Sequence, residues 1–489
     1  MGEIKQQTLS GVKWTAIERF SIQGVQFLLG IVVARLLTPA DYGLVGLLGI
    51  FLGISQTLID SGISNALVRK LDRDEADFST AFYFNIAVAT GCAAAIFFGS
   101  PWIAHFFKQP ELSPIAKLYS VNLIIGAFGM VQGAKLTIEV DFKTQARINF
   151  ISAVVSGIIC LVLAYLGWGV WSLVWQSIIS NVMRVILLWT STKWKPLLLF
   201  SKKSFNNLFG YGSKLMASGL LHTVYSELTT IAIGKFYTPA ALGNYYRGQG
   251  MSSLPVNMIT GMFGRVTFPI FSRIQNDDER LIRVYRNYIS SVMMLVVFFV
   301  MLIVALAKPL ILFLLTDKWS GAIIFVQVYA FAIVFDPICQ LNLNLLQVKG
   351  RSDLFLRLEI IKKIIATAIL FAAIPFGVLA ICISKVIYGQ IAVIINTYYT
   401  GKLFGLGYWK QCKDFLPYFA YSAIACAPAA ILAYLCPWHI VSLIVGAISA
   451  TIIYLAILRI CKDTVFMEHI HPYTNKLSKK FSIVFLGNL

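Results

Sequence analysis

Polar and cationic side chains interrupt the long apolar stretches of this sequence at helical spacing. In the first stretch they follow one another at steps of four, four, three and four, which places them on one face of a helix: Thr15, Arg19, Gln23, Gln26 and Gly30. A later stretch carries a similar face, formed by Lys214, Ser218, His222, Tyr225 and Thr229. Arginine and lysine are charged donors, and the amides and hydroxyls beside them both donate and accept. This pattern is typical of a hydrated, cationic cavity.

The stretch that follows each of these carries a second polar face. The earlier one holds Gln56, Asp60 and Ser64, and the later one holds Asn244, Arg247, Gly248, Ser252 and Pro255. If the stretches cross a membrane, such groups face a cavity or one another by default. Two alternatives stay open: Arg19 and Lys214 could extend to the membrane interface from nearby helix ends, and His222 could be a core histidine.

The composition indicates an integral membrane protein. Of the 489 residues, 58% are hydrophobic and 13% are charged, about half the charge of soluble domains. A helix needs about 20 apolar residues to cross a bilayer. The sequence offers fourteen such stretches: 12–37, 42–66, 79–107, 112–134, 148–167, 169–190, 208–236, 241–267, 286–315, 321–347, 358–375, 377–400, 415–436 and 438–460. Lipid excludes open sheets, so we expect an all-α bundle of about fourteen transmembrane helices.

The basic residues indicate the orientation. On this topology, 30 of the 41 Lys and Arg residues lie at the termini and in the loops on one side, and 6 lie in the opposite loops. Positive residues mark the cytoplasmic side, so we expect both termini in the cytoplasm. The N-terminus lacks the features of a cleavable signal. The net charge of +19 is spread through the loops, which argues against a nucleic-acid partner.

A repeat divides the chain. "ARLLTPADYG" at 34–43 returns as "GKFYTPAALG" at 234–243, "LDRDEADF" at 71–78 resembles "IQNDDERL" at 274–281, and Pro101 matches Pro309. The Thr-Pro-Ala segment alone could be no more than a favourable turn sequence. Three repeated segments in the same order, however, predict two parallel six-helix lobes around a central cavity. We expect lobes at 1–200 and 201–401, two additional helices within 402–460 and a basic cytoplasmic tail at 461–489.

No motif for catalysis, metal or cofactor binding is evident. The eight cysteines form no C-x-x-C pair and mostly lie in apolar stretches, where cysteine behaves as a small hydrophobic residue. No phosphate-binding loop or clustered acid–base set is present, so we expect neither an enzyme nor a built-in ATPase. The candidates for ion coupling are Glu18, Asp60 and Glu227. A further stripe, Asp336, Gln340, Asn344 and Gln347, fits helix–helix contact better than substrate binding.

Several longer sequence segments resemble those of a known family. Trp14, "ARLLTPADYG", "LIDSGISNALVRK" at 58–70, "FPIFSRIQND" at 268–277 and "LLQVKGRSDLFLRLE" at 345–359 resemble the polysaccharide exporter (Wzx-type) family. That family belongs to the multidrug/oligosaccharidyl-lipid/polysaccharide (MOP) flippase superfamily. The resemblance covers most of the chain to about residue 415 and is weakest in the last two stretches.

The resemblance implies a function. It implies movement of an undecaprenyl-pyrophosphate-linked oligosaccharide across the bacterial inner membrane by alternating access, for O-antigen, capsule or exopolysaccharide synthesis, with other assembly proteins as possible partners. The family offers no binding signature to carry over, so the site hypothesis depends on the helical faces. We expect Arg19, Lys214 and Arg247 to hold the pyrophosphate, with His222 beside them. We expect sugar hydroxyls to bind Gln23, Gln26, Tyr225 and Asn244.

Three alternatives remain open on the sequence. A cation-coupled multidrug exporter of the same superfamily would want carboxylates in the cavity, which looks more cationic than anionic. A lipid II flippase of cell-wall synthesis is the second. A membrane-embedded polymerase or transferase is the third, although such enzymes commonly have a large external loop. The glycan, the driving ion and the oligomeric state do not follow from the sequence.

Overall fold

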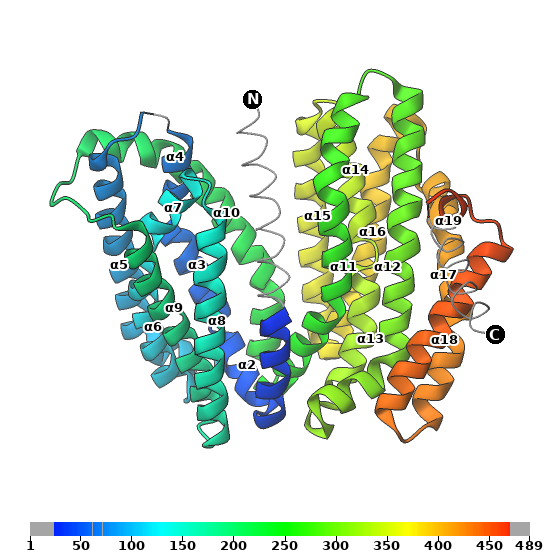
Figure 1. Cartoon of the computed structure of the whole chain (residues 1–489), viewed down its shortest axis with the longest axis horizontal. Helices are drawn as coiled ribbons and strands as arrows, with labels where there is room; N and C mark the ends of the chain where they lie inside the picture. Colours follow the sequence, from blue (N-terminus) through cyan, green and yellow to red (C-terminus); the bar gives the residue numbers. More distant parts are fainter. Residues whose placement is uncertain (1–23, 61, 71, 470–489) are drawn as a thin grey trace, which may run out of the picture. The chain divides into compact units, whose positions relative to one another are not determined.

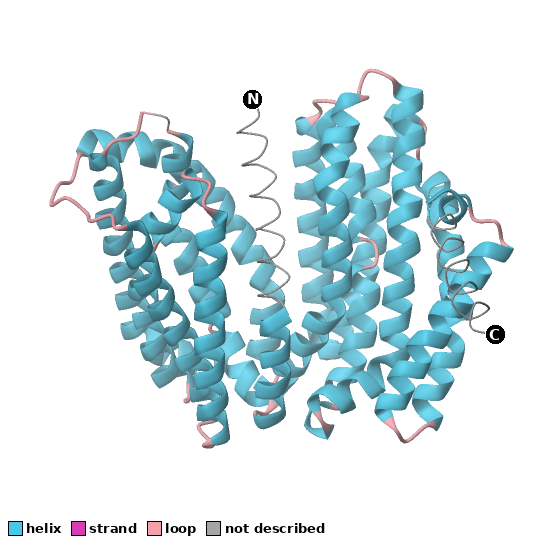
Figure 2. Cartoon of the chain, viewed as in Figure 1, coloured by secondary structure: helices cyan, strands magenta, loops and turns pink. Residues whose placement is uncertain are grey.

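Every regular element in the described part of the chain is a helix (Figures 1 and 2). The computed structural model describes residues 24–60, 62–70 and 72–469. Ten helical segments in these ranges are long and apolar enough to cross a membrane, which confirms an all-helical membrane protein. Three further long helices are more polar: α10 (Lys202–Phe236), α11 (Pro239–Arg273) and α15 (Ser352–Ala373). Two of these, α10 and α11, carry polar faces that the sequence predicted.

The chain packs into two compact units, Met1–Gly243 and Asn244–Leu489. The described helices of the first unit begin with Gly24–Leu36. They continue with α2 (Pro39–Leu47), α3 (Gly49–Asp60), α4 (Ile63–Arg69), α5 (Glu75–Phe107), α6 (Leu112–Ala127), α7 (Met130–Ile138), α8 (Phe142–Tyr165), α9 (Val170–Thr192) and α10. Within this unit α5 packs on α6, α8 packs on α9, and α10 packs against α3, α4 and α5.

The second unit contains most of α11 and all later helices. These are α12 (Asp278–Leu315), η1 (Asp317–Trp319), α13 (Ala322–Ile333), α14 (Asp336–Val348), α15, η2 (Ile374–Phe376), α16 (Val378–Phe404), α17 (Tyr408–Leu435), α18 (His439–Ile460) and α19 (Thr464–His469). The C-terminal helices α17 and α18 pack on α12. Arg286 of α12 makes two hydrogen bonds to Asp414 of α17, at 2.9 and 2.6 Å. The Tyr454 hydroxyl donates to the Met294 carbonyl at 2.7 Å.

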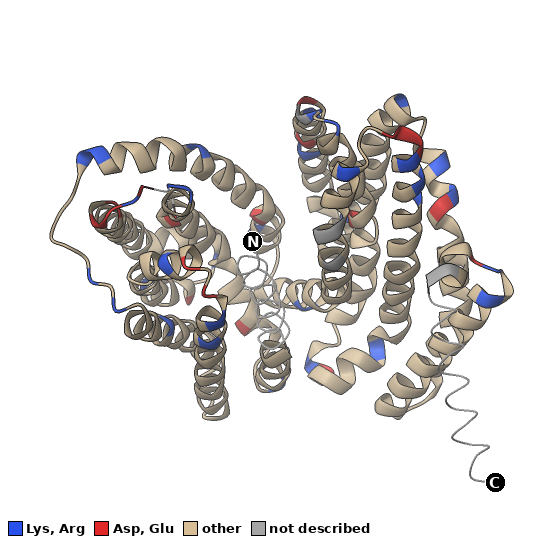
Figure 3. Ribbon diagram, turned by 45° about the horizontal axis from the view of Figure 1, so that its top comes forward, with Lys and Arg blue, Asp and Glu red and all other residues tan. Residues whose placement is uncertain are grey.

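Charged residues lie mostly near helix ends and loops within each unit, and long uncharged stretches separate them (Figure 3). This distribution is the one that a bilayer imposes, because charged groups in the hydrocarbon region are costly. The exceptions inside apolar helices are therefore candidates for function.

The second predicted stretch, 42–66, is broken rather than continuous. Helix α3 ends at Asp60 and α4 begins at Ile63, with Gly62 between them at φ +63°. A Cβ atom on Gly62 would lie 2.7 Å from the Gly212 carbonyl oxygen on α10. Glycine is required there for both conformation and space. The break lies beside Asp60, one of the predicted coupling residues.

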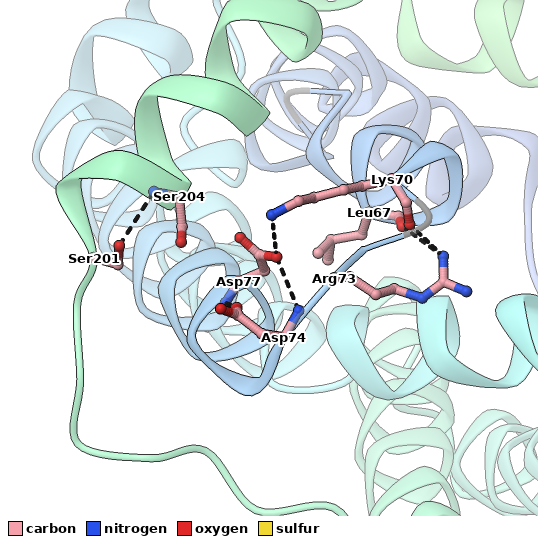
Figure 4. Close-up of polar contacts among 7 residues, drawn as sticks. All are labelled: Leu67, Lys70, Arg73, Asp74, Asp77, Ser201 and Ser204. Carbon is pink, nitrogen blue, oxygen red and sulfur yellow. Dashed lines mark hydrogen bonds and ion pairs between the residues drawn. The ribbon is translucent and has the colours of Figure 1, made fainter.

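An acidic corner follows α4 (Figure 4). The Lys70 ammonium donates to Asp77 at 2.6 Å, and the Asp77 side chain is fully buried. Asp74 caps α5 by accepting from the Asp77 amide, and Asp77 accepts in return from the Asp74 amide. Arg73 donates to three carbonyl oxygens at the end of α4. The hydrogen bond to Asp77 raises the pKa of Lys70 above its usual value, so Lys70 stays charged and the corner is held as an ion pair.

The two Thr-Pro-Ala segments lie against each other inside the first unit. Each begins a helix, with Pro39 at the start of α2 and Pro239 at the start of α11, where a missing N–H costs nothing. A Cβ atom on Gly43 would overlap the Pro239 carbonyl, and one on Gly243 would overlap the Pro39 carbonyl. The contact is therefore reciprocal, and it depends on glycine in both copies.

Candidate functional site

Three predicted residues lie outside the described ranges: Glu18, Arg19 and Gln23. Gln26 is described and exposed on the helix Gly24–Leu36. Gly30, the last residue of the predicted face, lies on the same helix and is half-buried.

Helix α10 carries the second predicted face, and its residues differ in burial. Lys214, Ser218 and His222 are exposed, Tyr225 is half-buried, and Thr229 is buried. Glu227, a predicted coupling residue on the same helix, is half-buried. Next to this face, the Thr223 hydroxyl lies 3.1 Å from the Thr57 hydroxyl of α3.

Helix α11 places Arg247 against an aromatic ring. The Arg247 guanidinium carbon lies 5.3 Å from the centre of the Trp319 ring, which is fully buried. Asn244 lies one turn earlier and borders Gly321 at the start of α13. Stacking on tryptophan stabilises a cation and fixes its plane, so Arg247 has a packing role that the sequence did not reveal.

Asp60 lines a polar cavity inside the first unit, and the cavity has a volume of about 390 Å³. We call it the amide cavity, because helices α3, α4, α8 and α9 supply five side-chain amides to its wall: Gln56, Asn65, Gln145, Asn149 and Asn181. One carboxylate, Asp60, and one guanidinium, Arg184, also line it. The cavity is therefore rich in neutral donors and acceptors and balanced in charge.

Glycines make room for the amide cavity. Three glycines line the cavity: Gly126 in the last turn of α6, Gly129 in the break between α6 and α7, and Gly133 on α7. Steps of three and four place them on one side of the chain. A Cβ atom on Gly133 would meet nothing within 4 Å, whereas one on Gly129 would lie 3.1 Å from a methyl group of Leu188.

Hydrogen bonds fix two of the cavity amides. Gln145 donates to the Thr137 hydroxyl at 2.9 Å. Asn181 donates to the Asn122 carbonyl oxygen at 2.9 Å, and Asn122 donates in turn to the Ser177 hydroxyl at 2.9 Å. These bonds use amide nitrogens, so the carbonyl oxygens of Gln145 and Asn181 are the atoms that can accept from a ligand.

The sequence analysis found only one wall of this cavity, the face of Gln56, Asp60 and Ser64. It missed Gln145 with Asn149 and Asn181 with Arg184. The signal was available for Asn181 and Arg184, which are three residues apart within the stretch 169–190. It was weaker for Gln145, which precedes the stretch 148–167.

The second unit holds charged groups of its own inside the helices. Lys385 of α16 donates to the Tyr245 hydroxyl at 2.6 Å and lies 5.4 Å from the Tyr329 ring centre. Lys362 of α15 is 6% exposed and pairs with Glu359. Pro337, Gln340 and Asn344 border a gap of about 10 Å³, which has the size of a single water. Of the predicted stripe on α14, Asp336, Gln340 and Gln347 are exposed and Asn344 is half-buried, so helix–helix contact within the second unit does not account for most of it.

No group of three or more His, Cys, Asp or Glu side chains in the described ranges could hold a metal ion. The cysteines in those ranges are all free thiols. The observed chemistry is that of polar and charged side chains facing internal space in a membrane bundle.

Comparisons with solved structures define the class of protein. The fold matches the lipid II flippase MurJ with a TM-score of 0.67, covering 92% of this chain and 99% of that one at 13% identity. It matches a multidrug resistance MATE transporter of the MOP superfamily with a TM-score of 0.58, covering 79% and 97% at 19% identity. The chain therefore has the fold of a MOP-superfamily transporter.

Sequence comparisons give the family. Residues 32–324 match the family described as "Polysaccharide biosynthesis protein", and the chain belongs to it. It is similar to the teichuronic acid biosynthesis protein TuaB of Bacillus subtilis, at 24% identity over 77% of this chain and 78% of that protein. It is also similar to the lipopolysaccharide biosynthesis protein WzxC of Escherichia coli, at 23% identity over 73% of each chain. The succinoglycan biosynthesis transport protein ExoT of Rhizobium meliloti is 23% identical over 64% of this chain and 63% of that protein. These findings confirm the predicted family and indicate a membrane transport protein, not an enzyme.

Proposed function

We propose that this protein moves an undecaprenyl-pyrophosphate-linked oligosaccharide from the cytoplasmic to the periplasmic leaflet of a bacterial inner membrane. The single observation that carries the proposal is the family match over residues 32–324. The likeness of the fold to a lipid flippase over nearly the whole chain supports it. A bundle with polar internal faces can carry a hydrophilic headgroup while the isoprenoid tail stays in lipid.

The proposed architecture keeps the fourteen spans, both termini in the cytoplasm, and two parallel six-helix repeats at 1–200 and 201–401. Two extra helices lie within 402–460, followed by the tail at 461–489. Helix α10 belongs to the second sequence repeat in this scheme, although it packs with the first unit. A duplicated segment and a packing unit need not share their boundary.

The proposed headgroup site consists of Arg19, Lys214 and Arg247, because arginine binds phosphate through two donors and lysine provides a point charge. His222 lies on the same face of α10 as Lys214. Sugar hydroxyls bind Gln23, Gln26, Tyr225 and Asn244 in this scheme. Glu18, Asp60 and Glu227 are the residues proposed for ion coupling.

A deletion strain tests the function. Lipid-linked oligosaccharides are extracted, and their membrane face is determined by access to an added glycosidase in inverted and right-side-out vesicles. We expect completed units to accumulate on the cytoplasmic face and surface polysaccharide to be lost. Unchanged lipid intermediates together with altered drug susceptibility would overturn the proposal in favour of a multidrug exporter. Accumulated lipid II would instead indicate a cell-wall flippase.

The headgroup assignment has its own test. Alanine at Arg19, Lys214 and Arg247 together removes three positive charges, and we expect export to fall to the level of the deletion strain at equal protein abundance. Undiminished export would show that the pyrophosphate is held elsewhere.

A further inference from the structure

We infer that the amide cavity of the first unit binds a neutral sugar ring of the transported glycan. The inference rests on the proposed function and makes it more specific. In this scheme the glycan and the pyrophosphate bind at different sites, and the proposed cationic residues hold the pyrophosphate. The inference also gives Asp60 a sugar-binding role beside the ion-coupling role proposed above.

The side chains that line the amide cavity fit a sugar. Each hydroxyl of a sugar ring both donates and accepts, and a side-chain amide offers both functions. Gln145 and Asn181 present carbonyl oxygens, because their nitrogens bind Thr137 and Asn122. The wall is thus oriented before a ligand arrives, which lowers the entropic cost of binding.

The charge of the cavity argues against other ligands. Pyrophosphate binding requires an excess of cations, but the described lining holds one guanidinium, Arg184, and one carboxylate, Asp60. A bound Ca²⁺ or Mg²⁺ is held by several oxygens that include carboxylates, and Asp60 is the one carboxylate among the described residues of the wall. A carboxylate is a strong acceptor for hydroxyl donors, so Asp60 suits a neutral ligand that is rich in hydroxyls.

The size sets a limit on what enters. A volume of about 390 Å³ lies near the lower end of the range for small-molecule sites, about 300 to 1,000 Å³. The cavity would therefore hold part of an oligosaccharide rather than a whole repeat unit. The polar wall excludes the isoprenoid tail, since burying these amides against hydrocarbon leaves their hydrogen bonds unmade.

Gly133 offers a clean way to close the cavity. Its Cβ position is open, so Gly133→Ala adds a methyl group without a clash, and Gly133→Leu extends a larger side chain from the same position. Gly91 on α5 is the matched control, because it is exposed and a Cβ there also meets nothing within 4 Å. Gly91→Leu adds the same side chain outside the cavity. Asp60→Asn removes the carboxylate charge and keeps its shape.

The binding experiment uses two probes and the full-length protein in detergent. One probe is the free oligosaccharide, which mild acid releases from the lipids of the deletion strain. This probe lacks the pyrophosphate. The other is inorganic pyrophosphate. Isothermal titration should show that the oligosaccharide binds the wild type and Gly91→Leu equally. We expect about tenfold weaker binding to Gly133→Leu, because two or more hydrogen bonds are lost. Asp60→Asn should show an intermediate loss, and pyrophosphate should bind all four proteins alike.

The outcomes separate the two proposals. If Gly133→Leu and Asp60→Asn bind the oligosaccharide as the wild type does, the sugar assignment is wrong while the flippase proposal stands. Loss of pyrophosphate binding in Gly133→Leu would assign the cavity to the headgroup instead, and would also overturn the inference. Absence of any accumulated lipid-linked oligosaccharide in the deletion strain would overturn the proposed function and the sugar site together.

Discussion

The segments Leu112–Ile138 and Ala322–Val348 are each broken into two helices, but the two breaks differ. In the first unit α6 ends at Ala127 and α7 begins at Met130, and the glycines around this break line a cavity of about 390 Å³. In the second unit α13 ends at Ile333 and α14 begins at Asp336, and the residues after that break border a gap of about 10 Å³.

The difference shows how a duplicated backbone feature can take two roles. A helix break frees backbone groups and changes the direction of the chain, and such breaks recur at transport sites. In the first unit Gly129 keeps the break open, because side chains at this position would occupy the space. In the second unit Pro337 lies in the first turn of α14, and Val334 and Phe335 at the break are buried. A break thus borders a cavity in one unit and is closely packed in the other.

The second unit has an acidic corner of its own, where Lys349 at the end of α14 meets Asp278 at the start of α12, and it differs from the corner at Lys70. Lys70 pairs with Asp77, whose side chain is fully buried, whereas Lys349 pairs at 2.5 Å with Asp278, whose side chain is 61% exposed. Both aspartates belong to the repeated acidic segment, and both lysines come from the end of another helix. Because of this difference in burial, we expect the loss of Lys70 to lower the free energy of unfolding more than the loss of Lys349.

The largest effect is expected from Lys70→Ala. It leaves the buried Asp77 carboxylate without its cation, and such losses cost about 3–5 kcal/mol. Unfolding of the purified protein in mixed micelles measures this cost. Adding Asp77→Asn should restore much of the stability, because the neutral amide needs no counter-charge. A loss below about 1 kcal/mol would remove the contrast between the corners.

An intermediate effect is expected from Gly129→Val. The Cβ atom alone would lie 3.1 Å from Leu188 and 3.2 Å from Val185, so the branched side chain overpacks the break. Overpacking typically costs about 1–3 kcal/mol. The same unfolding assay applies, with Gly91→Val as the control. Equal stability of the two variants would show that the break has more room than the packing indicates.

A small gain is expected from Gly133→Ala. The position lies inside α7 with open space beside it, and alanine in place of a helical glycine stabilises by about 0.5–1 kcal/mol. A higher midpoint of thermal unfolding would show that Gly133 lowers stability. Its presence at the cavity wall would then be explained by the space it leaves. A lower midpoint would mean that the cavity wall tolerates no added atom.

The smallest effect is expected from Lys349→Ala. The pair with Asp278 is exposed to solvent, and such pairs contribute about 0–1 kcal/mol. Measured beside Lys70→Ala, this variant is the internal reference for the repeat. A cost as large as that of Lys70→Ala would contradict the expected difference between the buried and the exposed ion pair.

Much of the fold could be predicted from the sequence, because hydropathy and helical spacing report directly on membrane helices. The class and the family follow from such patterns. The contact between the repeated turns and the helix breaks do not: Gly62 and Gly129 are short-range signals whose meaning depends on what approaches them, Gly212 and Leu188 respectively. The amide cavity was not predicted either, although Asp60 was identified on a polar face; Asn181 on another helix was not. A cavity is a property of several helices together, and one sequence shows the faces without their pairing.

The reciprocal contact of the Thr-Pro-Ala segments constrains both segments at once. Gly43 packs on the Pro239 carbonyl, and Gly243 packs on the Pro39 carbonyl. Any side chain at one glycine would have to displace the backbone of the other segment. Two stretches 200 residues apart in the chain therefore behave as one structural unit, in which neither can change alone.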